Sequence, residues 1–154
     1  YGDDVWAFLS KSAMPRLRVY LCPPHNRTHE QRLLFRDYLR RHGERAIERV
    51  ITIGSPHQGT VFGALGFGAN ARQMARGSAY LAQLAAGESA SLRRRFVCIA
   101  SADDSLIVPR ASALLPEAEQ HVIEGVGHLA LVEDVRAWEL IVAAIAATPA
   151  LAAG

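Results

Sequence analysis

The sequence lacks several features that would place it in particular classes of protein. No apolar run approaches the roughly 20 residues that a membrane-spanning helix needs, so we expect no membrane span. The net charge is only +2, and the arginines do not form one aromatic-rich basic patch, which argues against a nucleic-acid partner. The two cysteines, Cys22 and Cys98, lie in apolar stretches and predict buried thiols. None of these features indicates a cellular compartment.

Motifs for metal ions and phosphate groups are also missing. His25 and His29 are four residues apart, but their surroundings match no zinc-binding motif, and Pro23 and Pro24 indicate the start of a loop. A metal-dependent enzyme built on these two histidines is therefore only a third hypothesis. We expect no metal and no organic cofactor.

The order of apolar segments predicts the fold. With half of its 154 residues hydrophobic and no internal repeat or low-complexity linker, we treat residues 1–154 as a single domain. Strands are predicted at 17–22, 49–54, 96–100 and 121–124, and helices at 3–12, 30–42 and 131–147. This alternation predicts an α/β fold with a parallel sheet of about four strands and flanking helices.

Helical spacing also predicts which side chains face the core. In the second helix Phe35 and Leu39 share an apolar stripe, and Arg36 falls on the other side. The last helix has apolar residues at spacings of four and three, which predict its core-facing side: Leu131, Val135, Trp138, Val142 and Ile145. Residues 61–94, rich in glycine and alanine, delay the third strand and form an excursion where a lid would sit.

The strand at 49–54 runs into a polar turn with a distinctive sequence. Residues 53–60 read Ile-Gly-Ser-Pro-His-Gln-Gly-Thr, which resembles the Ile-Gly-Ser/Thr-Pro-His-x-Gly-Thr segment of bacterial lipases and esterases with the α/β-hydrolase fold. The resemblance covers about residues 33–147. It implies a serine-type hydrolase that cleaves carboxylic esters, such as acylglycerols or similar lipids, without a cofactor. It also implies that this chain is the C-terminal portion of such a fold, with a truncated sheet and a lid within 61–94.

Two loops of the sequence resemble the acid and histidine loops of that family. Asp103 and Asp104 follow a predicted strand, and the family's acid precedes a Val-Pro pair by four positions, which selects Asp104. Taken alone, both carboxylates could simply cap the turn, as aspartates commonly do. His128 ends a Gly-x-Gly-His loop in which two glycines permit a sharp turn off the last strand. An acid that orients a histidine, which then acts as general base and acid, is half of a Ser-His-Asp triad.

The nucleophile of such a triad cannot be named from the sequence. No Gly-x-Ser-x-Gly occurs, and its expected place at 23–32 holds neither serine nor glycine. Thr28 is the only hydroxyl there, but it lacks the glycines that an elbow needs. Ser55 lies at another strand end, where capping of the turn is the favoured role.

The missing nucleophile motif leaves a second hypothesis open. The chain could be a non-catalytic fragment or pseudoenzyme that binds lipid or a protein partner without turning it over. Strands of the family that precede the elbow have no counterpart here, and the sheet edge that they would cover predicts self-association.

Overall fold

A computed structural model describes residues 19–22, 35–37, 39–40, 48–65 and 69–147 of the chain. The predicted helix at 3–12 lies outside these residues. So does the segment at 23–32, with Thr28, His25 and His29. Predictions that depend on these positions therefore stay predictions.

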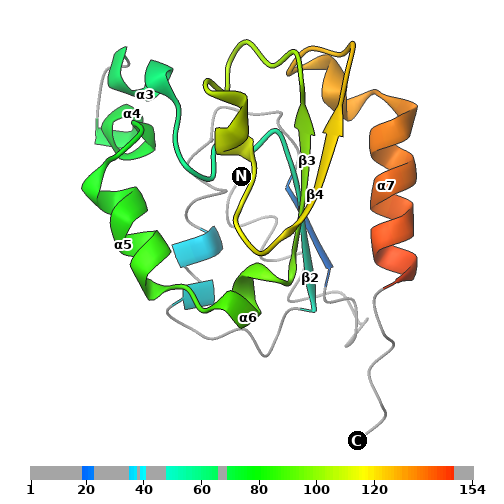
Figure 1. The fold of residues 1–154 in the computed structure, drawn as a ribbon, viewed down its shortest axis with the longest axis horizontal. Helices are drawn as coiled ribbons and strands as arrows, with labels where there is room; N and C mark the ends of the chain where they lie inside the picture. Colours follow the sequence, from blue (N-terminus) through cyan, green and yellow to red (C-terminus); the bar gives the residue numbers. More distant parts are fainter. Residues whose placement is uncertain (1–18, 23–34, 38, 41–47, 66–68, 148–154) are drawn as a thin grey trace, which may run out of the picture.

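A four-stranded parallel sheet forms the centre of the fold (Figure 1). Its strands are β1 (Val19–Cys22), β2 (Arg49–Ile53), β3 (Phe96–Ser101) and β4 (Glu119–Ile123). They lie side by side in chain order, with Val50 opposite Phe96 and Ile99 opposite His121. Because all strands run the same way, their carboxyl ends meet at one edge of the sheet, the upper edge in Figure 1.

The helices follow the strands in an α/β arrangement. Between β2 and β3 lie α3 (Val61–Leu65), α4 (Ala69–Met74), α5 (Ala79–Gly87) and α6 (Ala90–Arg93). The short 3-10 helices η1 (Arg110–Ala113) and η2 (Ala130–Val132) flank β4, and α7 (Val135–Ala146) follows. Residues 35–37 and 39–40 are also helical, within the predicted span 30–42.

Three helices begin at residues whose side chains cap them. Ser78, Ser89 and Asp134 accept hydrogen bonds from backbone N–H groups in the first turns of α5, α6 and α7. Such caps satisfy donors that a helix start would otherwise leave without an acceptor. The cap at Asp134 also explains why α7 begins four residues later than predicted.

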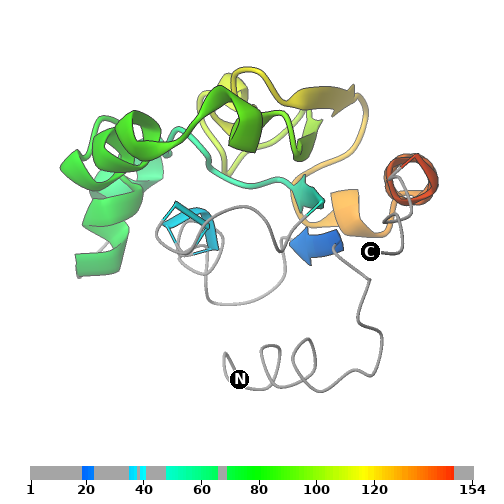
Figure 2. The same cartoon turned by 90° about the horizontal axis from the view of Figure 1, so that it is seen from below.

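Alternate residues of the central strands fill the two sides of the sheet. Ile51 and Ile53 of β2 belong to a core cluster with α7, whereas Val50 packs on the other side with Phe35 and Phe96. Figure 2 shows the sheet between α7 on one side and α3 to α6 on the other. Coverage on both faces explains why these strands read as continuous apolar runs.

The core-facing side of α7 differs from the prediction. Val135, Trp138, Val142 and Ile145 are between 42% and 67% exposed. The buried side consists of Ala137, Ile141 and Ala144, with Leu131 just before the helix. Both sets recur at helical spacing, so periodicity alone could not separate them. The sheet selects the alanine side, because small side chains let a helix axis approach it closely.

Arg36 also lies opposite to expectation. Its side chain is 3% exposed and forms an ion pair of 2.6 Å with Glu88, whose side chain is 0% exposed. Its third nitrogen donates a hydrogen bond to the backbone oxygen of His57. A buried arginine needs such partners, because an unpaired charge in the interior is costly.

The cysteine prediction is confirmed for one of the two residues. Cys98 is buried in β3 and is not part of a disulfide. Burial raises the pKa of its thiol, so the group stays neutral and packs as a small apolar side chain. The side chain of Cys22 lies outside the described part of the structure.

Candidate functional site

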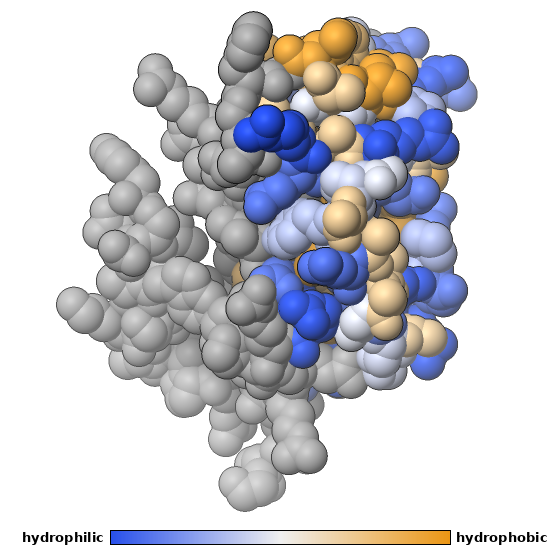
Figure 3. Space-filling model, turned by 90° about the vertical axis from the view of Figure 1, so that its left-hand side faces the viewer, coloured by the Kyte–Doolittle hydropathy of each residue, from blue (hydrophilic) through white to orange (hydrophobic). Residues whose placement is uncertain are grey.

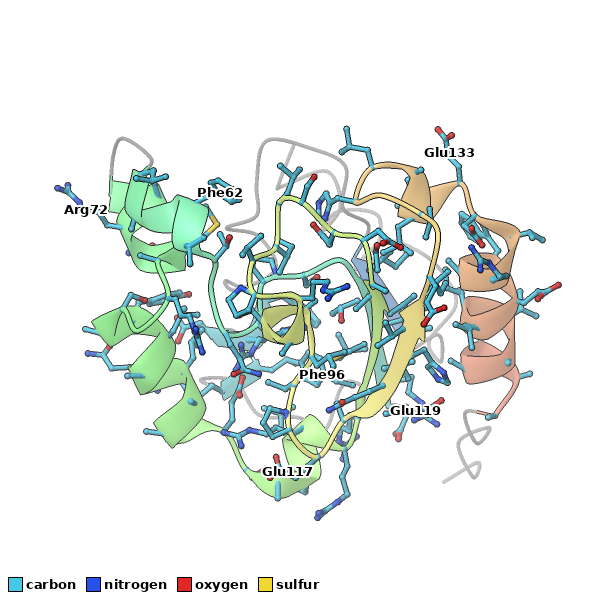
Figure 4. All side chains as sticks on the ribbon, turned by 45° about the horizontal axis from the view of Figure 1, so that its top comes forward. Phe62, Arg72, Phe96, Glu117, Glu119 and Glu133 are labelled. Carbon is cyan, nitrogen blue, oxygen red and sulfur yellow. The ribbon has the colours of Figure 1, made fainter. Side chains whose placement is uncertain are left out.

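Three loops meet at the carboxyl edge of the sheet. They follow β2 at 54–60, β3 at 102–108 and β4 at 124–128. Figure 4 shows this arrangement: Glu117 and Glu119 mark the amino end of β4, while Phe62 and Glu133 lie toward the opposite edge. Parallel α/β sheets commonly carry their chemistry at this edge, because the loops that meet there come from neighbouring strands.

Asp104 and His128 form a buried pair at this edge. His128 Nδ1 donates a hydrogen bond of 2.6 Å to Asp104 Oδ2, and the two side chains are 2% and 1% exposed. The pair brings together the two residues that the sequence singled out. With the Nδ1 proton directed at the carboxylate, a neutral ring has its lone pair on Nε2, the position of a general base.

The second oxygen of Asp104 holds the loop that follows β3. Oδ1 accepts hydrogen bonds of 2.8 Å from the backbone N–H groups of Leu106 and Ile107. Burial alone would raise the pKa of Asp104, but the hydrogen bonds from His128, Ile107 and Leu106 outweigh it and hold that pKa below its ordinary value. The carboxylate therefore caps a turn and orients an imidazole at the same time.

Asp103, the neighbouring carboxylate, holds the histidine loop rather than the histidine. Its Oδ2 accepts a hydrogen bond of 2.6 Å from the backbone N–H of Gly125, whose φ is +77°. The hydroxyl of Ser101 donates to the backbone oxygen of Val126, two residues before His128. Ser101 at the end of β3, and Asp103 and Asp104 after it, thus each bind the loop after β4.

Gly54 lies against the imidazole ring of His128 and leaves room for it because it has no side chain. A Cβ at this position would lie 3.0 Å from His128 Cε1 and 3.1 Å from its Nδ1. The φ of Gly54 is +53°, a value that side chains with a Cβ rarely adopt. From the sequence this glycine was expected only to end a strand, although its place in the motif at 53–60 was a usable signal.

No family model and no curated protein matches this chain. The assignment of a function therefore comes from the residues themselves, and above all from the Asp104–His128 pair. The hydroxyl of Ser55 and the exposed apolar side chains of the described residues also bear on that assignment.

Ser55 does not cap its turn through its side chain. Its hydroxyl is buried and has no hydrogen-bond partner among the described residues, whereas its backbone oxygen accepts a hydrogen bond from His57 N. The ring of His57, in the same turn, is buried, and its Nε2 lies 2.9 Å from Thr52 Oγ1. The nucleophile that the pair would serve is not identified in the described part of the chain.

Apolar side chains are exposed on α3 and in the segments that follow β3 and β4. They are Val61, Phe62, Leu65, Leu106 and Leu129. The space-filling view in Figure 3 shows apolar surface at the top of one face, over α3. Such a cluster is typical of a surface that contacts an apolar ligand or partner.

Other kinds of site find less support in the described residues. None of their His, Cys, Asp and Glu side chains form a group that could hold a metal ion. A cavity of about 250 Å³ lies beside Arg36 and His57, and neither Asp104 nor His128 lines it. Within the same part of the chain, no helix is both long enough and apolar enough to cross a membrane.

Proposed function

We propose that this chain is a carboxylic-ester hydrolase of the lipase or esterase kind, and that Asp104 and His128 supply its acid and base. The observation that carries the proposal is the 2.6 Å hydrogen bond between His128 Nδ1 and Asp104 Oδ2, buried at the carboxyl edge of a parallel sheet. The resemblance of residues 53–60, 101–109 and 125–128 to bacterial lipases and esterases supports it. The nucleophile remains to be identified.

In this mechanism the pair moves a proton twice. His128 Nε2 takes the proton of the nucleophile's hydroxyl while that oxygen bonds to the ester carbonyl carbon. When the tetrahedral intermediate collapses, the bond to the leaving alkoxide breaks and Nε2 gives the proton to it. Water then repeats the sequence on the acyl-enzyme and releases the acid. Asp104 keeps the ring in place and stabilises its charged form throughout.

The exposed apolar side chains of α3 support an ester with an acyl chain as the substrate. Phe62 and Leu65 are 48% and 74% exposed, and α3 lies toward the carboxyl edge of the sheet (Figure 1). Residues 61–94 would then act as a lid over the acyl group. The same side chains favour the second hypothesis, a non-catalytic protein that binds lipid, if no nucleophile is present.

Labelling with a fluorophosphonate probe, followed by peptide mass spectrometry, tests the proposal. We expect one labelled hydroxyl in the folded wild-type protein, no label in His128→Ala, and an undiminished label in His121→Ala. His121 is a suitable control because it is a half-buried histidine on β4 that bonds to Glu119, away from the pair. The labelled peptide would name the nucleophile.

Two outcomes would count against a hydrolase. Folded wild-type protein that takes no label has no activated hydroxyl, and binding of fatty-acid or monoacylglycerol probes would then support the lipid-binding hypothesis. Equal labelling of wild type and His128→Ala would mean that the pair does not activate the hydroxyl. Circular dichroism of each variant shows whether it is folded.

A further inference from the structure

Thr60, at the end of the motif that follows β2, is a junction between two segments of the chain. Its side-chain hydroxyl donates a hydrogen bond of 2.9 Å to the backbone oxygen of Leu106. The same oxygen lies 3.3 Å from the backbone N of Val108 and 3.4 Å from that of Phe62, both of which donate to it. A hydroxyl has one proton and two lone pairs, so Thr60 uses its full capacity here.

The bond to Leu106 connects Thr60 to the acid of the pair through a single residue. The backbone oxygen of Leu106 accepts from Thr60, and its backbone N–H donates to Asp104 Oδ1 at 2.8 Å. The other oxygen of Asp104 accepts from His128. Four groups therefore form a continuous series of hydrogen bonds from a threonine on one loop to a histidine on another.

The backbone of Thr60 fixes the start of the helical segment 61–94, and its side chain fixes the loop after β3. Its N–H donates to Met74 O at 3.0 Å, and Val61 N donates to Val108 O at 2.9 Å. An isolated parallel bridge joins Thr60 to Ala75. Helix α3 thus begins at a point fixed to both the acid loop and the end of α4.

We propose that Thr60 is a positioning residue that couples helix α3, with its exposed apolar side chains, to Asp104. A ligand that shifts α3 would move the Thr60 hydroxyl, and with it the peptide between Leu106 and Ile107, whose N–H donates to Asp104 Oδ1. This coupling extends the proposed function and rests on it only for its biological role. If the protein is a hydrolase, contact of an acyl group with α3 would change the positions of Asp104 and His128. The hydrogen bonds themselves do not depend on the reaction.

The test compares two buried threonines, one in β2 and one in the turn that follows it. Thr60→Val keeps the shape of the side chain and removes all three hydrogen bonds, and Thr60→Ser restores the hydroxyl. Thr52→Val is the matched control, because Thr52 is also buried and its hydroxyl bonds to His57 and Val97 rather than to the loop that contains Asp104. Should Thr60→Val not fold, Thr60→Ala removes the same hydroxyl with less bulk.

Two NMR signals report on the pair without any need for activity. One is the side-chain carboxyl carbon of Asp104, whose titration gives the pKa of that group. The other is the Nδ1 proton of His128, which a short bond to a carboxylate shifts far downfield; His128→Ala identifies it. We expect Thr60→Val to raise the pKa of Asp104 and to shift or broaden the proton signal. Thr60→Ser should restore both, and Thr52→Val should change neither.

The outcomes separate this proposal from the proposed hydrolase. If Thr60→Val leaves both signals at their wild-type values while losing stability, Thr60 is merely structural and the coupling is refuted. The coupling is also refuted if Thr52→Val changes the signals equally. If the signals respond as expected but the wild-type protein takes no fluorophosphonate label, the coupling stands and the hydrolase assignment fails. Responsive signals together with labelling that falls in Thr60→Val and recovers in Thr60→Ser would support both.

Discussion

Two buried pairs of ionisable side chains lie in different parts of this molecule, and they have similar distances and burial. Arg36 and Glu88 are 2.6 Å apart, with side chains 3% and 0% exposed. His128 and Asp104 are also 2.6 Å apart, with side chains 2% and 1% exposed. Burial and distance therefore do not tell a structural pair from one proposed to be catalytic.

The two pairs differ in how their hydrogen bonds are used. Arg36 donates to both carboxylate oxygens of Glu88 and to the backbone oxygen of His57. Arginine side chains do not exchange their proton near neutral pH, so a pair of this kind can only hold elements together. Here these are the helical residues around 36, the end of α5 and the turn after β2. A guanidinium bonded in this way is suited to a purely structural role.

The pair at the carboxyl edge is suited to moving a proton. One ring nitrogen of His128 donates to Asp104. Histidine is the only residue type whose ordinary side-chain pKa lies near neutral pH. Asp104 is fixed by backbone N–H groups rather than by a second charge. What distinguishes the two pairs is therefore a partner that can change its protonation, placed where loops from three strands meet.

The largest effect on stability should come from breaking the pair of Arg36 and Glu88. Glu88→Ala leaves the Arg36 charge buried and unpaired, which should lower the free energy of unfolding by about 3–5 kcal/mol. Glu119→Ala removes the exposed partner of Arg49 and should cost less than about 1 kcal/mol. Urea denaturation measures both. Equal, small losses would show that the Arg36 pair does not stabilise the fold.

A smaller effect on stability, with a characteristic pH dependence, should come from breaking the pair of Asp104 and His128. Asp104→Asn should lower the free energy of unfolding at pH 7 by about 1.5–3 kcal/mol, since hydrogen bonds to a charged group are lost. The folded pKa of Asp104 lies below its unfolded value of about 3.9, so its contribution is complete above that value. It disappears as the pH falls through the folded pKa.

Urea denaturation of wild type and Asp104→Asn over a range of pH measures this dependence. The difference between the two proteins should shrink toward acid. A difference that grows toward acid, or that does not change with pH, would contradict the lowered pKa and weaken the contrast with the Arg36 pair.

The smallest change in stability, but a specific change at the site, should come from Gly54→Ala. Gly77→Ala is its control: both glycines have positive φ, +53° and +76°, but no atom lies within 4 Å of a Cβ at 77. Each should lose about 1–2 kcal/mol through backbone strain. Only Gly54→Ala should also displace His128, which the downfield Nδ1 proton and fluorophosphonate labelling would report. A wild-type proton signal in Gly54→Ala would mean that Gly54 does not support the imidazole.

The sequence predicts the second of these pairs and misses the first. The resemblance of the loops at 101–109 and 125–128 to lipases and esterases selected Asp104 and His128, and the pairing of β3 with β4 brings these two loops together. Arg36 and Glu88 are separated by 52 residues and carry no motif. Their pairing depends on where the long excursion between β2 and β3 returns to the sheet, which no local pattern specifies.

The last helix shows a different limit. Its apolar residues form two stripes, and hydrophobicity favoured the bulky one that includes Trp138. Close packing against the sheet instead placed Ala137, Ile141 and Ala144 inside. Trp138 satisfies its indole N–H by donating to Val132 O at 2.7 Å, which lets it lie at the surface. Periodicity located the helix, and the space beside the sheet determined its rotation.

The order of the strands has a consequence for the growing chain on the ribosome. Because the four strands lie in the sheet as they occur in the sequence, each new strand adds beside one that has already been made. Asp104 precedes β4 and His128 follows it, so the last strand separates the two halves of the pair. A nascent chain that has emerged only through the loop after β3 already contains Arg36 and Glu88, but it has Asp104 without His128. The structural pair is therefore synthesised first, and the proposed proton transfer requires β4 and the loop after it.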